Sequence, residues 1–355
     1  MLLYWLLLAF PASMALAYPS NRARVTNDAA QSIAYLFFII CYVLLAGLRF
    51  EVGGDWATYN TIYEDIRTDT LAYALQNYDP LFAIVAWISA KFGMGIYLVN
   101  GVCAYLLIFG VVQVAMRLRE PWLALTIAVP YLLIVVGMGY VRQGAAIGLI
   151  LMAIASFDRS RPIRTVAFLI LAIGFHSSSI VAFPLFSYAL AARYKIAAVF
   201  FAIVGAFIWM SVVAPRLGTY EAGYIDAEYE SSGAVPRILM NVLPSALLLL
   251  RWRYFGASDR VRSVWILVAS ANMLALAALY LTPSSTAVDR VALFFSPIQM
   301  AVFGEFRDLV PIDGRMLLLS RLLLIGLAVA VQVVWLVFAT HSQYWVPYKS
   351  IIEAL

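Results

Sequence analysis

Long apolar runs, separated by short polar segments, dominate the sequence. A helix needs about 20 residues to cross the roughly 30 Å hydrocarbon core of a bilayer. Twelve runs approach that length, and we predict helices near residues 2–18, 32–48, 95–116, 121–137, 140–157, 163–176, 177–192, 196–213, 237–250, 263–281, 291–305 and 316–339. The pattern indicates an all-α polytopic integral membrane protein, with residues 1–355 forming a single transmembrane domain.

Two apolar runs need a separate interpretation. Residues 81–92 lie between Asp79-Pro80 and Lys91 and are too few to cross the bilayer, so we predict a short interfacial or re-entrant helix. Residues 165–190 could form one long helix or a hairpin broken at His176. Basic residues flank this run on both sides, and a hairpin keeps both flanks in the cytoplasm. We therefore favour the hairpin.

The basic residues set the orientation. With these helices, 16 of the 24 Lys and Arg residues fall on the cytoplasmic side. The chain then crosses the membrane an even number of times, and both termini lie outside the cytoplasm. The long outer loops, 49–94 and 214–236, are the segments expected to cover a site. Loop 214–236 contains tyrosines and carboxylates that suit sugars, although a solvated loop has the same composition.

Composition supports the membrane class and narrows the chemistry. Hydrophobic residues make up 64% of the chain, charged residues 12%, and the mean hydropathy is +0.90. The net charge of +5 is modest and gives no indication of a nucleic acid partner. Cys41 and Cys103 lie in apolar runs, so neither a disulfide framework nor a metal cluster is expected.

Four groups of unusual polar residues fall on the outer face in this topology. Their members are Arg49 and Asp55 around a glycine pair, Tyr140-Val141-Arg142-Gln143, His176, and Asp289-Arg290. Singly, each has an ordinary explanation, because arginines at helix ends reach the interface and a lone histidine more often caps a helix than catalyses. Together, at one membrane face, they indicate a functional site.

Arg142 is the most informative of these residues. It lies in an apolar segment near Gly144 and Gly148, whose four-residue spacing favours close helix packing. An intramembrane arginine needs a partner, and Asp55, Asp289 or a ligand phosphate would serve. No second His or Cys stands at ligand spacing from His176, so no metal site is expected.

Arginines and acids at one outer surface suit a reaction that joins an anionic leaving group to a hydroxyl acceptor. Guanidinium groups match phosphate oxygens and would stabilise a departing pyrophosphate. A carboxylate or an imidazole would remove the acceptor proton. This is the chemistry of glycosyl transfer from a lipid pyrophosphate.

Three short motifs resemble the EpsG family of bacterial exopolysaccharide proteins, which are grouped with the Wzy-type polymerases. They are Leu48-Arg49 with Val52-Gly53-Gly54-Asp55 and Tyr59, then Tyr140-Val141-Arg142-Gln143, then His176-Ser177-Ser178-Ser179. The resemblance implies a polysaccharide polymerase that works at the periplasmic face of the inner membrane on polyprenyl-pyrophosphate-linked oligosaccharides. A helical bundle of the glycosyltransferase-C type would fit this function.

The resemblance also implies roles. Arg49 and Arg142 would hold pyrophosphate, Asp55 or His176 would be the base, and Gln143 would orient a sugar hydroxyl. Tyr59 would help to bind substrate, and the topology adds Asp289 and Arg290 to the substrate-binding set. No cofactor is expected. Since the chain has no Asp-x-Asp pair, we expect an inverting, metal-independent transferase.

The sequence also fits other functions and offers contacts for partners. A flippase for lipid-linked oligosaccharide would also need buried arginines, but it should show repeated halves and charge near the bilayer midplane. An O-antigen ligase or a membrane acyltransferase would share the outer-face site. A chain-length regulator or export proteins are possible partners, for which the basic run Arg251 to Arg262 would offer a contact.

Overall fold

The computed structural model describes residues 1–18, 29–158, 162–191, 195–210, 233–281, 285–310 and 314–354. Within these ranges the chain is helical and has no strand beyond one isolated bridge between Arg49 and Ser350. Most of the predicted loop 214–236 lies outside the described residues. The predicted all-helical class is therefore confirmed.

Each of the twelve predicted apolar segments corresponds to helical structure. The first four elements of this kind are α1 (Leu2–Ala17), α2 (Ala29–Gly47), α6 (Gly95–Ala115) and the continuous run α7 (Pro121–Ala128), η1 (Val129–Val136) and α8 (Gly137–Gly139). The next four are α9 (Val141–Asp158), α10 (Pro162–Phe175), η2 (Ser177–Val181) with α11 (Ala182–Ala191), and α12 (Lys195–Ile208). The last four are α14 (Ala234–Arg251), α15 (Asp259–Leu281), α16 (Ser285–Ala292) with η7 (Leu293–Phe295) and α17 (Ile298–Gly304), and α19 (Gly314–Val333) with η8 (Val334–Phe338). Short helical elements outside these segments include η6 (Trp252–Tyr254), α18 (Phe306–Leu309), η9 (Ser342–Tyr344) and α20 (Ile351–Ala354).

Seven described helices are long and apolar enough to cross a membrane. The others, among them α1, α10 and α11, are shorter than the roughly 20 residues that a straight crossing requires. The structure thus supports a multi-pass membrane protein, while the count of about twelve spans stays a prediction. Large apolar side chains on the outer face of α2, including Ile33, Phe37 and Leu44, are about half exposed or more, as expected for a surface covered by lipid.

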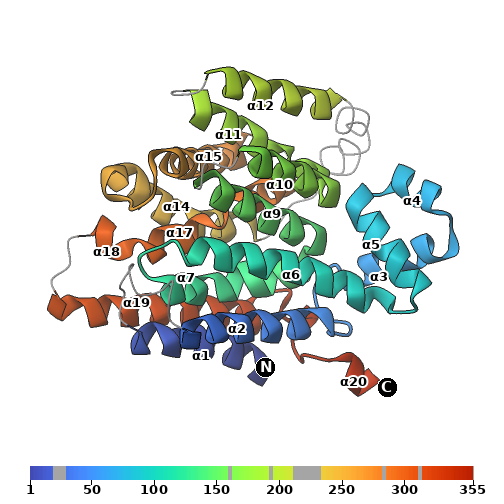
Figure 1. The fold of residues 1–355 in the computed structure, drawn as a ribbon. Coiled ribbons are helices and arrows are strands. Elements are labelled where there is room, and N and C mark those ends of the chain that lie inside the picture. Colours follow the sequence, from blue (N-terminus) through green and yellow to red (C-terminus); the bar gives the residue numbers. More distant parts are fainter. Residues whose placement is uncertain are drawn as a thin grey trace.

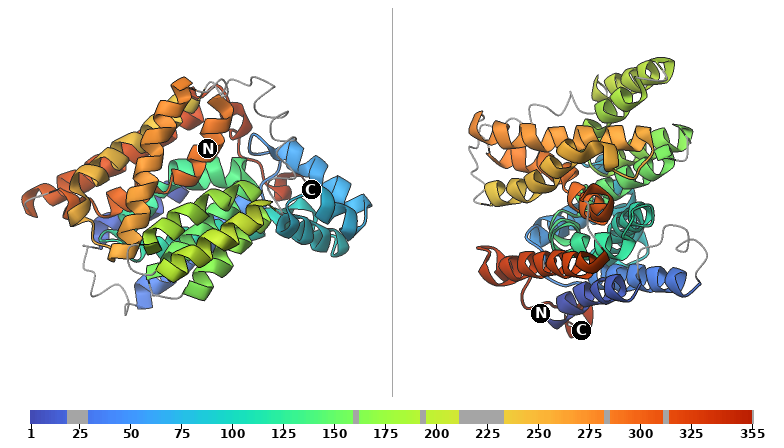
Figure 2. Two further views of the ribbon diagram at one scale, coloured as in Figure 1. Left: turned by 90° about the horizontal axis from the view of Figure 1, so that it is seen from above. Right: turned by 90° about the vertical axis from the view of Figure 1, so that its left-hand side faces the viewer.

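The helices stack in layers. In Figures 1 and 2, α1, α2 and α19 lie along one side, and α12 lies at the opposite edge. The central helices pack closely because glycines meet there. A Cβ atom at Gly148 of α9 would overlap the backbone of Leu106 in α6, and a Cβ at Gly110 would overlap Gly148. Gly148 therefore has the packing role that its spacing predicts.

Residues 49–94, expected as an outer loop, fold into three helices. These are α3 (Trp56–Thr68), α4 (Leu71–Asn77) and α5 (Pro80–Lys91), which lie together at one end of the stack beside the start of α6 (Figure 1). The short helix predicted at 81–92 is α5. An amphipathic pattern in α3 explains the difference, because its buried residues Tyr59, Tyr63 and Ile66 recur at helical spacing.

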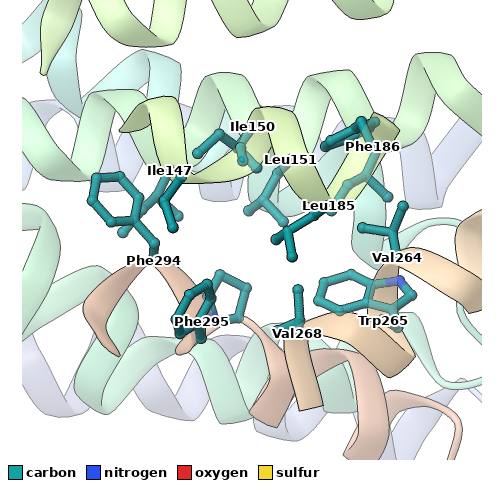
Figure 3. A pocket seen from close by; sticks show the side chains of 14 residues that line it. Ile147, Ile150, Leu151, Leu185, Phe186, Val264, Trp265, Val268, Phe294 and Phe295 are labelled. Carbon is teal, nitrogen blue, oxygen red and sulfur yellow. The ribbon is translucent and has the colours of Figure 1, made fainter. Parts of the chain in front are cut away.

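An apolar cluster supports the other half of the molecule. Figure 3 shows side chains of α9, α11, α15 and η7 converging around a small void of about 20 Å³. Trp265 of α15 and Phe186 of α11 are almost fully buried there. Phe294 belongs to this cluster and also stacks on His176, with ring centroids 6.0 Å apart. The cluster therefore supports one face of the histidine.

Candidate active site

The glycine-rich turn after α2 places Asp55 at the start of α3. Gly53 has a φ of +107°, and a Cβ atom there would overlap the carbonyl of Met138, so only glycine fits. The Gly53 N–H donates to the carbonyl of Tyr344 at 2.8 Å. This bond fastens the turn to the C-terminal segment. Asp55 is the N-cap residue of α3 but makes no side-chain cap bond, so its carboxylate is available to the site.

Asp55 pairs with Arg290. The Arg290 Nη1 atom lies 3.7 Å from Asp55 Oδ2, and the Arg290 guanidinium lies over the Tyr140 ring, 4.3 Å from its centroid. The sequence predicted that Asp289 and Arg290 precede a helix, but both lie inside α16, which starts at Ser285. Gln143 fixes this helix against α9, because its Nε2 donates to the Arg290 carbonyl at 2.6 Å.

Asp79 joins the second charged group and is the residue that the sequence analysis missed. It is buried, and its Oδ2 atom accepts a hydrogen bond from Arg142 Nη1 at 2.9 Å and lies 3.7 Å from His176 Nδ1. Its Oδ1 accepts the backbone N–H of Ser177 at 3.2 Å. Neither Asp55 nor Asp289, which the sequence offered as partners for Arg142, makes this bond. The only sequence signal for Asp79 was an Asp-Pro step at the start of a short helix.

His176 lies at a break in the helical backbone. Its φ and ψ of −157° and 111° are extended, and the 3-10 turn η2 follows directly. The break predicted at His176 is thus observed. Because the chain changes direction there, the imidazole faces Asp79 on one side and Phe294 on another. Tyr59 completes this group, with the Arg142 guanidinium 5.6 Å from its ring centroid.

Both charged groups open into one cavity of about 1260 Å³. Its polar wall is made of residues from four separate stretches of chain, namely Asp55, Tyr59, Tyr140, Arg142, Gln143, His176, Ser178 and Arg290. Six of the eight predicted site residues therefore line the same space. Within the described residues, no group of three His, Cys, Asp or Glu side chains is placed to hold a metal ion.

The other two predicted residues, Arg49 and Asp289, do not line the cavity. Asp289 instead forms a two-pronged ion pair with Arg237 of α14, at 2.9 and 2.7 Å. Sequence analysis passed over Arg237, although a single arginine within an apolar helix is itself a sign of such a pair. The pair joins α14 to α16 directly beside Arg290.

Arg49 is fully enclosed by protein. Its guanidinium donates to the carbonyls of Ala46, Val52 and Met138 and to Asn100 Oδ1. The sequence expectation that Arg49 and Asp55 share a site is not met, since their partners are different. Arg49 ties the end of α2 to the glycine turn and to α8, and so supports the loop that carries Asp55.

Replacing Arg49 with lysine is expected to lower the thermal unfolding midpoint. Lysine cannot reproduce the fork of donors, and each buried carbonyl left without a donor costs about 1–3 kcal/mol. Thermal unfolding in detergent micelles measures the effect, and Arg67→Lys, at an exposed pair with Glu64, is the control. An unchanged midpoint for Arg49→Lys would contradict this structural role.

The two carboxylates differ in acidity. Burial raises the pKa of Asp55 above its usual value, and the positive charges of Arg290 and Arg142 oppose this rise without cancelling it. Burial alone would also raise the pKa of Asp79, but the contacts with His176 and Arg142 outweigh it, so the pKa lies below the usual value. Asp79 therefore stays ionised at pH values where Asp55 takes up a proton.

Carboxyl ¹³C NMR should show this order directly. As the pH falls, Asp55 should protonate first and Asp79 later. Because Arg290 lowers the pKa of Asp55, Arg290→Gln should move the Asp55 midpoint to higher pH. The control Arg67→Gln should leave the Asp55 midpoint where it is. A midpoint that falls in Arg290→Gln would contradict the electrostatics of the pair.

Comparison with known proteins agrees with the motifs. Residues 32–350 match the model of the EpsG family. The chain belongs to the EpsG family. All three motif segments and every residue of the polar wall fall within the matched range. No curated protein and no solved structure matches this member of the EpsG family.

Proposed function

We propose that this protein is a membrane-embedded glycosyltransferase that joins polyprenyl-pyrophosphate-linked oligosaccharide repeat units into a polysaccharide at the periplasmic face of the inner membrane. The observation that carries the proposal is the single cavity in which Arg142 and Arg290 lie with Asp55 and His176. Membership of the EpsG family supports the same conclusion.

Arg142 and Arg290 hold the pyrophosphate in this proposal. Guanidinium groups bind phosphate oxygens in two-pronged geometry and stabilise the charge that develops as pyrophosphate departs. Each is already oriented by a carboxylate and an aromatic ring before any ligand arrives, Arg142 by Asp79 and Tyr59, Arg290 by Asp55 and Tyr140. Donors fixed in advance need little reorganisation during the reaction.

His176 is the general base. Its Nδ1 atom lies 3.7 Å from Oδ2 of buried Asp79 and its ring stacks on Phe294, so the imidazole is held between these two groups. The acceptor hydroxyl oxygen attacks the anomeric carbon of the donor sugar, and the bond from that carbon to the pyrophosphate oxygen breaks. The electron pair leaves with the pyrophosphate, and the hydroxyl proton passes to Nε2 of His176. One displacement inverts the configuration at the anomeric carbon.

The remaining cavity residues have supporting roles. Asp55 holds Arg290 in place and is exposed enough to accept a hydrogen bond from a sugar hydroxyl. Gln143 acts through the Arg290 backbone, because its amide is bonded to that carbonyl. Asp289 and Arg49 act at a distance, through Arg237 and through the glycine turn.

Residues near both ends of the described chain lie close to the candidate site. Tyr4 near the N-terminus donates to the carbonyl of Trp345, and the Phe50 N–H donates to the carbonyl of Lys349. Both chain ends therefore lie near the turn that carries Asp55. A chain that crosses the membrane an even number of times has both termini on one side, and here that side would be the side of the site.

Deletion of the gene in its host tests the function. A polymerase should leave single lipid-linked repeat units on the periplasmic leaflet, whereas loss of a flippase would leave them on the cytoplasmic leaflet. Loss of a ligase would leave finished polymer on its lipid carrier.

Activity of the purified protein should persist in EDTA, because the proposed reaction uses no metal ion. Activity that is lost in EDTA and restored by Mg²⁺ or Mn²⁺ would contradict a metal-independent reaction.

A further inference from the structure

The cavity has an apolar half that the reaction does not use. Beyond the charged wall it continues between η2, α11 and α12. This half is lined mainly by apolar and aromatic residues, among them Phe183, Tyr188, Phe201, Ala202, Ala206 and Trp209. The whole space exceeds the roughly 300–1,000 Å³ of most small-molecule sites. One continuous cavity is therefore charged at one end and apolar at the other.

We propose that the apolar lobe between α11 and α12 binds the polyprenyl chain of the lipid-linked substrate, which enters sideways from the bilayer between these helices. The inference rests on the proposed function, since it concerns the tail of the lipid whose pyrophosphate Arg142 and Arg290 hold. A ligand that fills such a cavity needs an anionic head joined to a long apolar chain. Polyprenyl pyrophosphate has this chemistry.

The packing of α12 makes a sideways route possible. Among the described elements, α12 packs chiefly on α11 and lies at the edge of the stack (Figure 1). Its outer side chains, including Ile196, Ile203 and Phe207, are largely exposed, as on a helix that faces lipid. One side of the lobe is therefore a helix with few other contacts in the described chain.

One close approach between α11 and α12 involves Gly205 and Phe183. A Cβ atom on Gly205 would lie 3.2 Å from Cβ of Phe183, and the rings of Phe183 and Phe201 lie 6.3 Å apart. Ala202 and Ala206 lie one turn apart on the same helix and leave space beside this contact. Ala202, Gly205 and Ala206 line the lobe together with Phe201 and Trp209. Ile196, Ile203 and Phe207 lie on the outer face of the same helix.

Neighbouring residues on α12 provide a matched pair of variants. Ala206→Trp should fill the lobe, whereas Phe207→Trp changes the outer face. The measurement is binding of a long-chain polyprenyl pyrophosphate and of a short-chain geranyl pyrophosphate to the purified full-length protein. Ala206→Trp should bind the long chain at least about tenfold more weakly, because excluding even two buried methylene groups has about that effect. The short-chain affinity, and both affinities of Phe207→Trp, should stay within about twofold of wild type.

The possible results distinguish failure of the lobe assignment from failure of the proposed glycosyltransferase function. Equal long-chain affinity in Ala206→Trp and wild type would overturn the lobe assignment while the transferase proposal stands. Wild type that binds neither pyrophosphate would overturn both. Wild-type protein supplies a second measurement, with a polyprenyl pyrophosphate that carries a diazirine near its chain end. Crosslinks should map to residues 180–209, and crosslinks confined to other helices, or displacement of phospholipid alone from the lobe, would overturn the inference.

Discussion

Replacing His176 with glutamine is expected to lower the rate constant of glycosyl transfer by about 10²–10⁴-fold, the usual contribution of a general base. Glutamine keeps a polar side chain of similar reach but cannot accept the proton of the hydroxyl. Since Arg142 and Arg290 are untouched, binding of the lipid pyrophosphate should stay close to wild type. Single-turnover rates with lipid-linked repeat units, measured beside equilibrium binding, separate the two effects.

The second histidine in the chain supplies the control for this variant. His341 stacks on Tyr344 and does not line the cavity, so His341→Gln should polymerise at the wild-type rate. If His176→Gln turned over within a few-fold of wild type, His176 would not be the base. A loss confined to KM would instead assign it a binding role, and Asp55 would become the base to test next.

Replacing Arg142 with alanine is expected to lower the rate constant by about 10²–10³-fold and to weaken binding of the lipid pyrophosphate. The loss follows because the variant removes preorganised donors from the leaving group. Arg142→Lys should recover only part of the rate, since an ammonium group carries the charge but lacks the two-pronged geometry. Pyrophosphate release and lipid binding, measured in both variants, are the readouts.

Folding must be checked in the Arg142 variants, because buried Asp79 loses the hydrogen bond from Arg142 in Arg142→Ala. Arg142→Lys keeps a positive charge beside Asp79, so its thermal unfolding midpoint should stay closer to that of wild type than the midpoint of Arg142→Ala. Arg67→Ala, at an exposed ion pair, should change neither rate nor binding. Wild-type rates in both Arg142 variants would contradict a pyrophosphate site at this residue.

The helices could be predicted well from the sequence, because their lengths follow from uninterrupted apolar runs. The predicted segments 95–116 and 140–157 correspond to α6 (Gly95–Ala115) and α9 (Val141–Asp158). The break at His176 was predicted, but other departures from regular helix were not. The wide turns of η1 around Pro130 and the break between η7 and α17 depend on how backbone bonds are satisfied by packing, and hydropathy carries no information about that.

The sequence predicted which residues line the site better than it predicted which of them form ion pairs. Topology alone brought Asp55, Arg142, His176 and Arg290 to one face, and these residues line one cavity. The pairing of Arg142 and His176 with Asp79 follows from how the start of α5 lies beside α9 and the end of α10, and a single sequence contains no record of that approach. Asp79 was overlooked for this reason.

Arg49 illustrates the opposite error. An arginine after a membrane helix resembles a ligand-binding or interfacial residue, and nothing local indicates burial. Its enclosure depends on Asn100 and Met138, which are distant in sequence. The motif resemblance therefore singled out a residue that holds the site together. It could not show whether Arg49 contacts the substrate or stabilises the turn that carries Asp55.

The most direct test of the glycosyltransferase proposal is a polymerisation assay with purified protein and a synthetic polyprenyl-pyrophosphate-linked repeat unit, read as a gel ladder. We expect a ladder from wild type and from His341→Gln, and none from His176→Gln or Arg142→Ala. No ladder from wild type, together with protein-dependent movement of the lipid across a liposome bilayer, would contradict the account and identify a transporter.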